Sequence, residues 1–170
     1  MPERSYIRDG RAPVPKDERT SATMSRIRAT NTGPELAMRS ALCARGIRGY
    51  RLHYAKVAGR PDIAFVGKRV AVFVHGCFWH RCPYCKRQGP KSNSAWWRKK
   101  LDANQLRDRR KQRQLRTAGW SVITVWECRL RSNPRAQADR VGRGLALINA
   151  LGTSYRRVGE RTASQRPRRT

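Results

Sequence analysis

Residues 59–80 read GRPDIAFVGKRVAVFVHGCFWH, and this stretch decides the fold. It contains two β-rich apolar runs, 62–66 and 69–75, which are separated by Gly67 and Lys68. This pattern predicts two strands paired as a hairpin with a tight turn at Gly67-Lys68. Gly59-Arg60-Pro61 predicts a turn just before the first strand. The regular pattern stops after His75, so an irregular segment is expected over 76–93.

The flanking sequence predicts three helices and two more strands. Thr32, Pro34 and Glu35 form a capping-box pattern, so a helix is expected to start there and to stop at Gly46. The other expected elements are a strand over the alternating residues 50–56, a long basic helix over 94–118 that Ser94 caps and Gly119 ends, an apolar central strand over 120–126, and a helix over 134–150. This order predicts an α/β fold in which helices flank a mixed sheet.

The length of 170 residues suits one domain with tails. Residues 24–151 are the expected folded unit. Residues 1–23 are rich in Pro, Gly and charge and predict a flexible basic N-terminal arm, and 152–170 predict a basic disordered tail.

The formal net charge is +28, which points to a polyanion as partner. Nucleic acid is the first candidate and an anionic membrane surface the second. No run approaches the roughly 20 apolar residues of a spanning helix, and no amphipathic basic helix carries an aromatic apolar face. We therefore expect no membrane association. The N-terminus MPERSYIRDG has no apolar signal core, so a cytoplasmic location is predicted.

One acid stands out in the charge pattern. Between Leu36 and Leu101 there are fifteen Lys and Arg residues, and Asp62 is the single acid. Asp62 could form a salt bridge with a neighbour such as Arg60. It could instead bind a hard cation next to a phosphate, since such cations prefer oxygen ligands. Metal-assisted phosphodiester hydrolysis needs this combination of attracting cations and one metal-binding anion.

Cysteines favour a second metal site. Cys82-Pro83-Tyr84-Cys85 is a CxxC knuckle, Cys77 precedes it and Cys128 follows the apolar strand. Four thiolates form a closed tetrahedral structural zinc site. His75 or His80 could replace Cys128 as the fourth ligand. Cys43, beside Leu42 on a helix face, is predicted to be an ordinary buried thiol.

Histidines and aromatic residues gather around the first cysteine. His75 and His80 flank the string Gly-Cys-Phe-Trp, and either ring could take a proton or hold a phosphate oxygen. One of them could also be a zinc ligand, with the other packed in a loop. His53, in the alternating segment 50–56, is interpreted as structural. Phe78-Trp79 and Trp96-Trp97 lie in basic contexts where exposed rings could wedge between DNA bases.

Five segments together resemble the very short patch repair (Vsr) DNA mismatch endonucleases. They are MSRIRAT at 24–30, GRPD at 59–62, VFVHGCFWH at 72–80, RDRR at 107–110, and GW with VWEC at 119–128. The resemblance covers about residues 22–131, and HGCFWH is its most specific part. It implies a restriction-endonuclease-like fold with a structural zinc site. It also implies a Mg²⁺-dependent enzyme that nicks double-stranded DNA 5′ to the thymine of a T·G mismatch arising from deamination of 5-methylcytosine.

The resemblance also implies roles for individual residues. Asp62 matches the magnesium-binding aspartate, and Val74 matches the position whose backbone carbonyl is a second magnesium ligand. His80 matches the general base and His75 a phosphate-contacting catalytic histidine. Glu35 matches an acid near the metal-bound waters, and the capping box explains it equally well. Further matches are the intercalating aromatics and the minor-groove arm residues: Phe78, Trp79, Trp97, Met24 and Ile27.

The chain departs from the family around the zinc site. Cys82 stands where the family has a zinc-binding histidine, and Cys85 is displaced by one residue from its counterpart. Cys77, Cys82, Cys85 and Cys128 still offer four ligands. The resemblance further implies a monomer, an association with the nucleoid when bound to DNA, and a link to a mismatch-repair matchmaker protein.

Two rival functions remain at the level of sequence. A related nuclease acting on unmodified or structured DNA would keep Asp62 and the zinc without mismatch preference. A non-catalytic zinc-containing DNA-binding protein would keep the charge and the cysteines, but it would have no need of Asp62 or His80.

Overall fold

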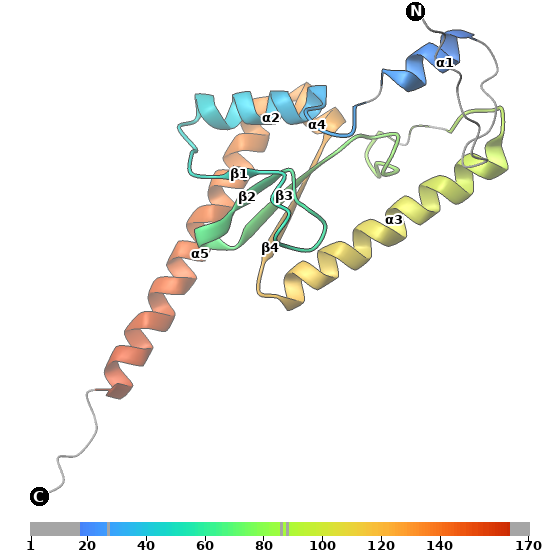
Figure 1. Cartoon of the computed structure of the whole chain (residues 1–170). Coiled ribbons are helices and arrows are strands. Elements are labelled where there is room, and N and C mark those ends of the chain that lie inside the picture. The colour runs from blue at the N-terminus through green and yellow to red at the C-terminus, as the bar shows by residue number, and fades with distance from the viewer. Residues whose placement is uncertain (1–17, 27, 86, 88, 164–170) are drawn as a thin grey trace, which may run out of the picture.

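The computed structural model describes residues 18–163 except 27, 86 and 88 (Figure 1). Its helices and strands follow the order α1 (Glu18–Ser25), α2 (Gly33–Ala44), β1 (Arg51–Leu52), β2 (Ile63–Phe65), β3 (Val70–His75), α3 (Ser94–Thr117), β4 (Ser121–Trp126), α4 (Glu127–Ser132) and α5 (Pro134–Ala163). A mixed sheet flanked by helices confirms the predicted α/β class. No described helix has both the length and the apolar character needed to cross a membrane.

The sheet has the strand order β1-β2-β3-β4. β1, β2 and β3 pair antiparallel, with Ile63 opposite Val72. β4 lies parallel to β3, with His75 opposite Trp126. Parallel neighbours need a long crossover, and α3 lies on the connection between these two strands.

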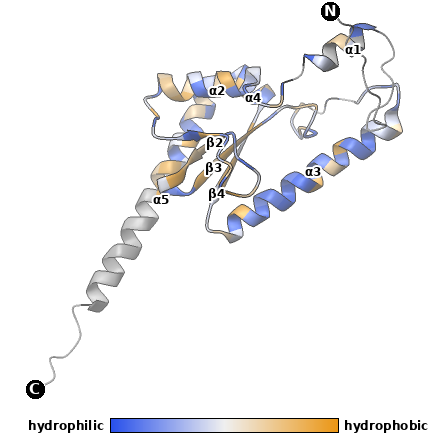
Figure 2. Ribbon diagram, viewed as in Figure 1, coloured by the Kyte–Doolittle hydropathy of each residue, from blue (hydrophilic) through white to orange (hydrophobic). Residues whose placement is uncertain are grey.

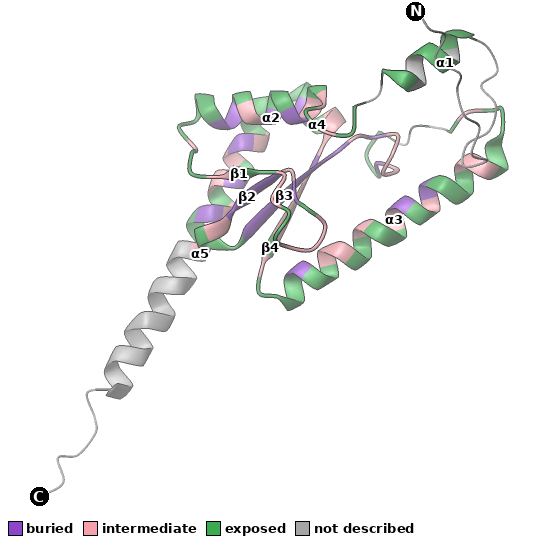
Figure 3. Cartoon of the chain, in the orientation of Figure 1, coloured by how far each residue is buried: buried purple, intermediate pink, exposed green. Residues whose placement is uncertain are grey.

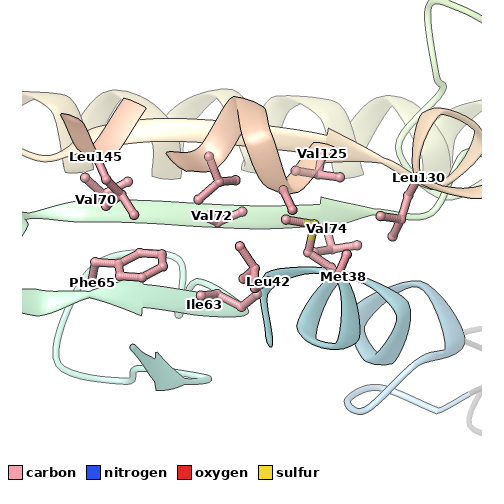
Figure 4. Close-up of a cluster of buried hydrophobic side chains, with 13 residues drawn as sticks. Met38, Leu42, Ile63, Phe65, Val70, Val72, Val74, Val125, Leu130 and Leu145 are labelled. Carbon is pink, nitrogen blue, oxygen red and sulfur yellow. The ribbon is translucent and has the colours of Figure 1, made fainter. Parts of the chain in front are cut away.

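Helices cover both faces of the sheet. Successive side chains of a strand point to opposite faces, so β3 divides its residues between two cores. Val70, Val72 and Val74 pack into the larger core with residues of α2, α4 and α5 (Figure 4). Ala71 and Phe73 pack on the other face against Leu115 of α3. β3 is therefore buried along its whole length (Figure 3).

α3 is a polar helix laid on an apolar sheet. Figure 2 shows hydrophilic residues along most of α3 and hydrophobic residues along the strands. Among its residues, Leu101, Asn104 and Leu115 are buried. α3 ends as predicted just before Gly119, whose φ of +76° glycine adopts without strain.

Several predicted boundaries differ from the structure. The strand expected over 50–56 is limited to Arg51–Leu52, because His53 has a left-handed φ of +46° that ends the extended conformation. The β2–β3 turn is longer than predicted, with a 3₁₀ turn over Val66–Lys68 and Arg69 at φ +49°. Four-residue hairpin loops of this kind are commonly built on a type I turn.

Two helices fall outside the predicted set. α1 spans Glu18–Ser25 and lies across the expected boundary at residue 24, and α4 follows directly from β4. α5 begins at Pro134 as predicted and runs to Ala163, past the predicted end at residue 150 and into the segment 152–170 expected to be a disordered tail.

The topology brings three strand ends together. Because β2 runs antiparallel to β3, the residue before β2 meets the end of β3. Because β4 runs parallel to β3, the residues after β4 reach the same edge. Asp62, His75 and Glu127 therefore meet at one end of the sheet although they are far apart in sequence.

Candidate active site

A cleft of about 940 Å³ opens at this end of the sheet. Acidic and imidazole side chains line it together with basic ones. The acids and histidines are Glu35, Asp62, His75, His80, Asp108 and Glu127, and the basic residues are Arg26, Arg28, Arg60, Lys100, Arg107 and Lys111. A few anionic groups thus lie within a cationic rim, an arrangement that attracts phosphates while keeping carboxylates available.

Asp62 is held against the end of β3. The backbone N–H of Val74 donates to Asp62 Oδ2 over 2.7 Å. Burial raises the pKa of Asp62 to about 6, although the Val74 hydrogen bond opposes that rise. The alternative of a salt bridge to Arg60 is not found, since Arg60 Nε donates instead to the carbonyl of His53 over 3.2 Å. A partly buried carboxylate without a cationic partner is a suitable ligand for a metal ion.

Glu35 forms the predicted capping box and also faces Asp62. Its Oε2 accepts the backbone N–H of Asn31 over 3.0 Å, and its Oε1 accepts the hydroxyl of Thr32 over 2.8 Å. The side chain is buried. Ligand atoms of Glu35, His53 and Asp62 lie within 4.8 Å of one another and could hold a metal ion. Glu35 can therefore cap helix α2 and also serve as an acid of the site from the same position.

His75 and His80 form a stacked pair beside Asp108. Their ring centroids are 3.9 Å apart with an interplanar angle of 11°. His80 Nδ1 lies 2.5 Å from Asp108 Oδ2. With Nδ1–H donating to this carboxylate, the Nε2 atom of His80 carries the free lone pair. The pair thus provides an oriented imidazole that can accept a proton.

Burial and the neighbouring His80 lower the pKa of His75 to about 4. His75 is consequently neutral at physiological pH. It can contact a phosphate oxygen through a neutral N–H group, not as a cation.

The three aromatic residues expected at DNA lie together next to this pair. Phe78 is 5.0 Å from Trp79 and 5.3 Å from Trp97 between ring centroids, and Trp79 and Trp97 are 5.9 Å apart. All three are partly exposed. Ile27 and the side chain of Met24, the expected arm contacts, lie outside the described residues.

Four cysteines form a cluster that is separate from the His75–His80–Asp108 group. Sulfur atoms of Cys77, Cys82, Cys85 and Cys128 lie within 4.8 Å of one another, and Cys82 Sγ is 3.6 Å from Cys128 Sγ. Zn–S bonds of about 2.3 Å in a tetrahedron place sulfurs about 3.8 Å apart, so the donor set fits zinc. The cluster contains Cys128 and neither histidine. Cys43 was expected to be buried, but the structure corrects this prediction because its side chain is exposed.

Backbone contacts prepare this cluster for a metal. Burial opposes ionisation of Cys82, but hydrogen bonds from the N–H groups of Cys85 and Tyr84, together with those from the thiols of Cys128 and Cys77, lower the pKa of the thiol. The backbone N–H of Cys128 also donates to Cys77 Sγ over 3.2 Å. The cluster connects the loop after β3 to the start of α4.

Sequence reasoning missed four residues that shape the site. Asn104 donates to the carbonyl of Trp79 over 3.1 Å, and Asp108 one turn later on α3 contacts His80. Glu127 Oε2 accepts the N–H of Cys77 over 3.0 Å. His53 lies beside Glu35 and Asp62. The spacing of Asn104 and Asp108 on one face of a basic helix was the available signal, since residues four apart are neighbours.

Comparisons with known proteins identify related chains. The family described as DNA mismatch endonuclease Vsr matches residues 13–86. The chain is 45% identical over 113 residues to the type II nicking enzyme V.XorIIP of Xanthomonas oryzae pv. oryzae, covering 66% of this chain and 82% of that protein. It is 43% identical over 123 residues to the type II nicking enzyme V.NaeI of Lentzea aerocolonigenes, covering 69% and 73%. It is 35% identical over 115 residues to the DNA mismatch endonuclease Vsr of Escherichia coli, covering 68% and 73%.

Proposed function

This chain belongs to the Vsr family of DNA mismatch endonucleases, and on that premise we propose that it nicks one strand of duplex DNA 5′ to the thymine of a T·G mismatch. Such mismatches arise when 5-methylcytosine is deaminated, so the reaction would start very short patch repair. The observation that carries the proposal is the meeting of Asp62 with the His75–His80–Asp108 group in one cationic cleft.

Asp62 and the Val74 carbonyl would hold a Mg²⁺ ion. The fit is supported by a partly buried carboxylate that lacks a cationic partner and accepts the Val74 backbone N–H over 2.7 Å. When bound, the ion would neutralise charge on the scissile phosphate and make an attacking water more acidic. Glu35 lies close enough to orient water molecules at this position.

His80 would be the general base. Its Nδ1 is fixed by Asp108, so Nε2 can accept the proton of the attacking water. The carboxylate of Asp108 then stabilises the imidazolium that forms. His75, stacked on His80, would steady a phosphate oxygen through its neutral N–H group.

Mismatch selection would depend on the Phe78, Trp79 and Trp97 rings. Inserting rings between base steps costs a few kcal/mol of lost stacking, and this cost is smaller at a weakly stacked T·G wobble pair. The anchoring of Trp79 by Asn104 supports this role, because a fixed wedge loses less conformational entropy on insertion.

The cysteine cluster would bind a structural Zn²⁺ ion that fixes the loop carrying Phe78, Trp79 and His80. We extend the proposal to a restriction-endonuclease-like domain over 24–151, with basic tails at 1–23 and 152–170 that add nonspecific DNA affinity. In this proposal the protein is a cytoplasmic monomer that associates with the nucleoid when it binds DNA. A mismatch-repair matchmaker protein is the proposed partner.

A nicking assay tests the function. Duplexes that differ only by a central T·G would be compared with and without Mg²⁺, in several methylated and unmethylated flanking sequences. The expected result is one Mg²⁺-dependent nick 5′ to the mispaired T and none in the paired duplex. Equal cutting of both duplexes would favour a general nuclease. Tight binding without cutting in any flank would favour a DNA-binding protein.

A further inference from the structure

His53 is attached to the segment that carries Asp62. Its backbone N–H donates to the Asp62 carbonyl over 3.1 Å, and its own carbonyl accepts Arg60 Nε over 3.2 Å. The residue has a φ of +46°, in the left-handed region that histidine, asparagine and aspartate adopt more often than other non-glycine residues. These backbone contacts hold residue 53 beside Asp62, and a ring nitrogen of His53 lies within 4.8 Å of an Asp62 carboxylate oxygen.

The ring nitrogen of His53 is buried without a hydrogen-bond partner. Nε2 is the one buried side-chain nitrogen or oxygen among the described residues that lacks such a partner. An unsatisfied buried polar atom costs about 1–3 kcal/mol, so a structure that retains one needs an explanation. The ion-pair contact of His53 Nε2 with Glu35 Oε2 spans 3.5 Å. That separation is too long for a hydrogen bond of ordinary strength.

The carboxylates do not supply the missing partner. No oxygen of Glu35 or Asp62 makes a hydrogen bond with His53 Nε2. Hydrogen bonds from Asn31 and Thr32 to Glu35, and from Val74 to Asp62, hold these carboxylates in place and leave lone pairs available for a metal ion. One ligand atom from each of Glu35, His53 and Asp62 lies within 4.8 Å of the other two. Metal–ligand bonds of about 2.1 Å separate ligand atoms by about 3.0–4.2 Å in an octahedron, so this spacing can accommodate one ion.

We propose that His53, through Nε2, is a nitrogen ligand of the divalent cation bound at Asp62, beside Glu35. The proposal rests on the metal site of the proposed function and adds a protein ligand to it. Glu35 and Asp62 line the cleft, whereas His53 does not. The nitrogen therefore approaches from the protein side and leaves the cleft side for water and phosphate.

A nitrogen ligand changes the preference of the site among metals. Magnesium takes oxygen ligands almost exclusively, whereas the divalent transition metals, of which Mn²⁺ binds nitrogen-containing sites least tightly, also accept imidazole nitrogen. The wild-type protein should therefore bind Mn²⁺ more tightly than Mg²⁺. Loss of His53 should reduce the ratio of the Mn²⁺ affinity to the Mg²⁺ affinity, because only oxygen ligands would remain.

Electron paramagnetic resonance of Mn²⁺ added to the full chain, with zinc retained and without DNA, tests the proposal. Titration gives the affinity, and electron spin echo modulation reports a coordinated ¹⁴N nucleus. The variants are His53→Gln, His53→Asn, His80→Gln and Asp62→Asn. Asparagine tolerates the left-handed backbone at position 53, so the two His53 variants separate loss of the ligand from misfolding. His80→Gln removes the other partly buried imidazole at the cleft and is the matched control.

We expect ¹⁴N modulation in the wild type and in His80→Gln, and its loss in both His53 variants with Mn²⁺ bound at least about tenfold more weakly. Modulation that persists in both His53 variants, while Asp62→Asn abolishes Mn²⁺ binding, would overturn the role of His53 and leave the proposed metal site intact. Unchanged Mn²⁺ binding in Asp62→Asn would overturn the ligand assignment and the metal site together. The nicking assay separately decides whether the T·G activity stands.

Discussion

Replacement of Asp62 by asparagine should stabilise the protein at neutral pH when no divalent cation is added. Burial raises the pKa of Asp62 from an ordinary 3.8 to about 6, so the folded state is penalised for ionising a carboxylate that ionises freely in the unfolded chain. The gap between these two pKa values corresponds to about 3 kcal/mol once both states are ionised. Asparagine cannot ionise and is free of this penalty.

The sign of the effect depends on pH. Between about pH 4 and pH 6 the folded state retains a proton that the unfolded state has released, so the wild type loses stability as the pH rises through this window. The variant lacks this dependence. Its stability relative to the wild type should therefore grow by up to about 3 kcal/mol from pH 4 to pH 7.5. An effect of asparagine on packing is the same at pH 4 and pH 7.5, so it cancels when the two stability differences are compared.

Urea unfolding followed by tryptophan fluorescence, at several pH values without Mg²⁺, measures this difference. Added Mg²⁺ should close most of this difference, because a ligand that binds only the folded wild type stabilises it by about 2.7 kcal/mol at 100 times its Kd. Nicking by the variant should be abolished. A difference in stability that stays constant from pH 4 to pH 7.5 would refute the assignment of Asp62 as a desolvated carboxylate available to a cation.

Three further predictions concern the base, the cysteines and the turn before β2. Asp108→Asn should lower kcat for nicking by about 100-fold or more without weakening DNA binding, since it disorients the general base. Asp102→Asn, on the same helix and paired with Arg81, should leave kcat within about twofold; equal losses in the two variants would contradict the role of Asp108. Cys82→Ser should lose bound zinc in metal analysis and lower Tm, whereas Cys43→Ser should retain both, because Cys43 is exposed and lies outside the cluster. Gly59→Ala should lower the free energy of unfolding by about 1–3 kcal/mol in urea titrations, because φ is +80° there and the new Cβ would lie 3.1 Å from the Lys111 Cβ atom; an unchanged value would show that the turn can relax.

Local signals in the sequence determined much of the fold. The β-rich runs 62–66 and 69–75 became β2 and β3, and the capping box at Thr32 and Glu35 started α2 where expected. The 94–118 pattern became α3. These features depend on hydrogen bonds and side-chain periodicity within a few residues, so they can be predicted without tertiary information. The prediction of a strand over 50–56 was too long, because alternation of residue types does not reveal the left-handed backbone at His53.

The sequence by itself also determined the chemistry of the site, because the isolated Asp62, the CxxC pair and the HGCFWH string each carry functional groups within a short segment. Only the tertiary structure decided which groups meet. His80 contacts Asp108 across 28 residues and Cys77 contacts Glu127 across 50. These contacts exist because α3 crosses over the sheet and because β2 and β4 reach the same end of β3. The partner of a side chain is set by the packing of elements distant in sequence, which local pattern does not record.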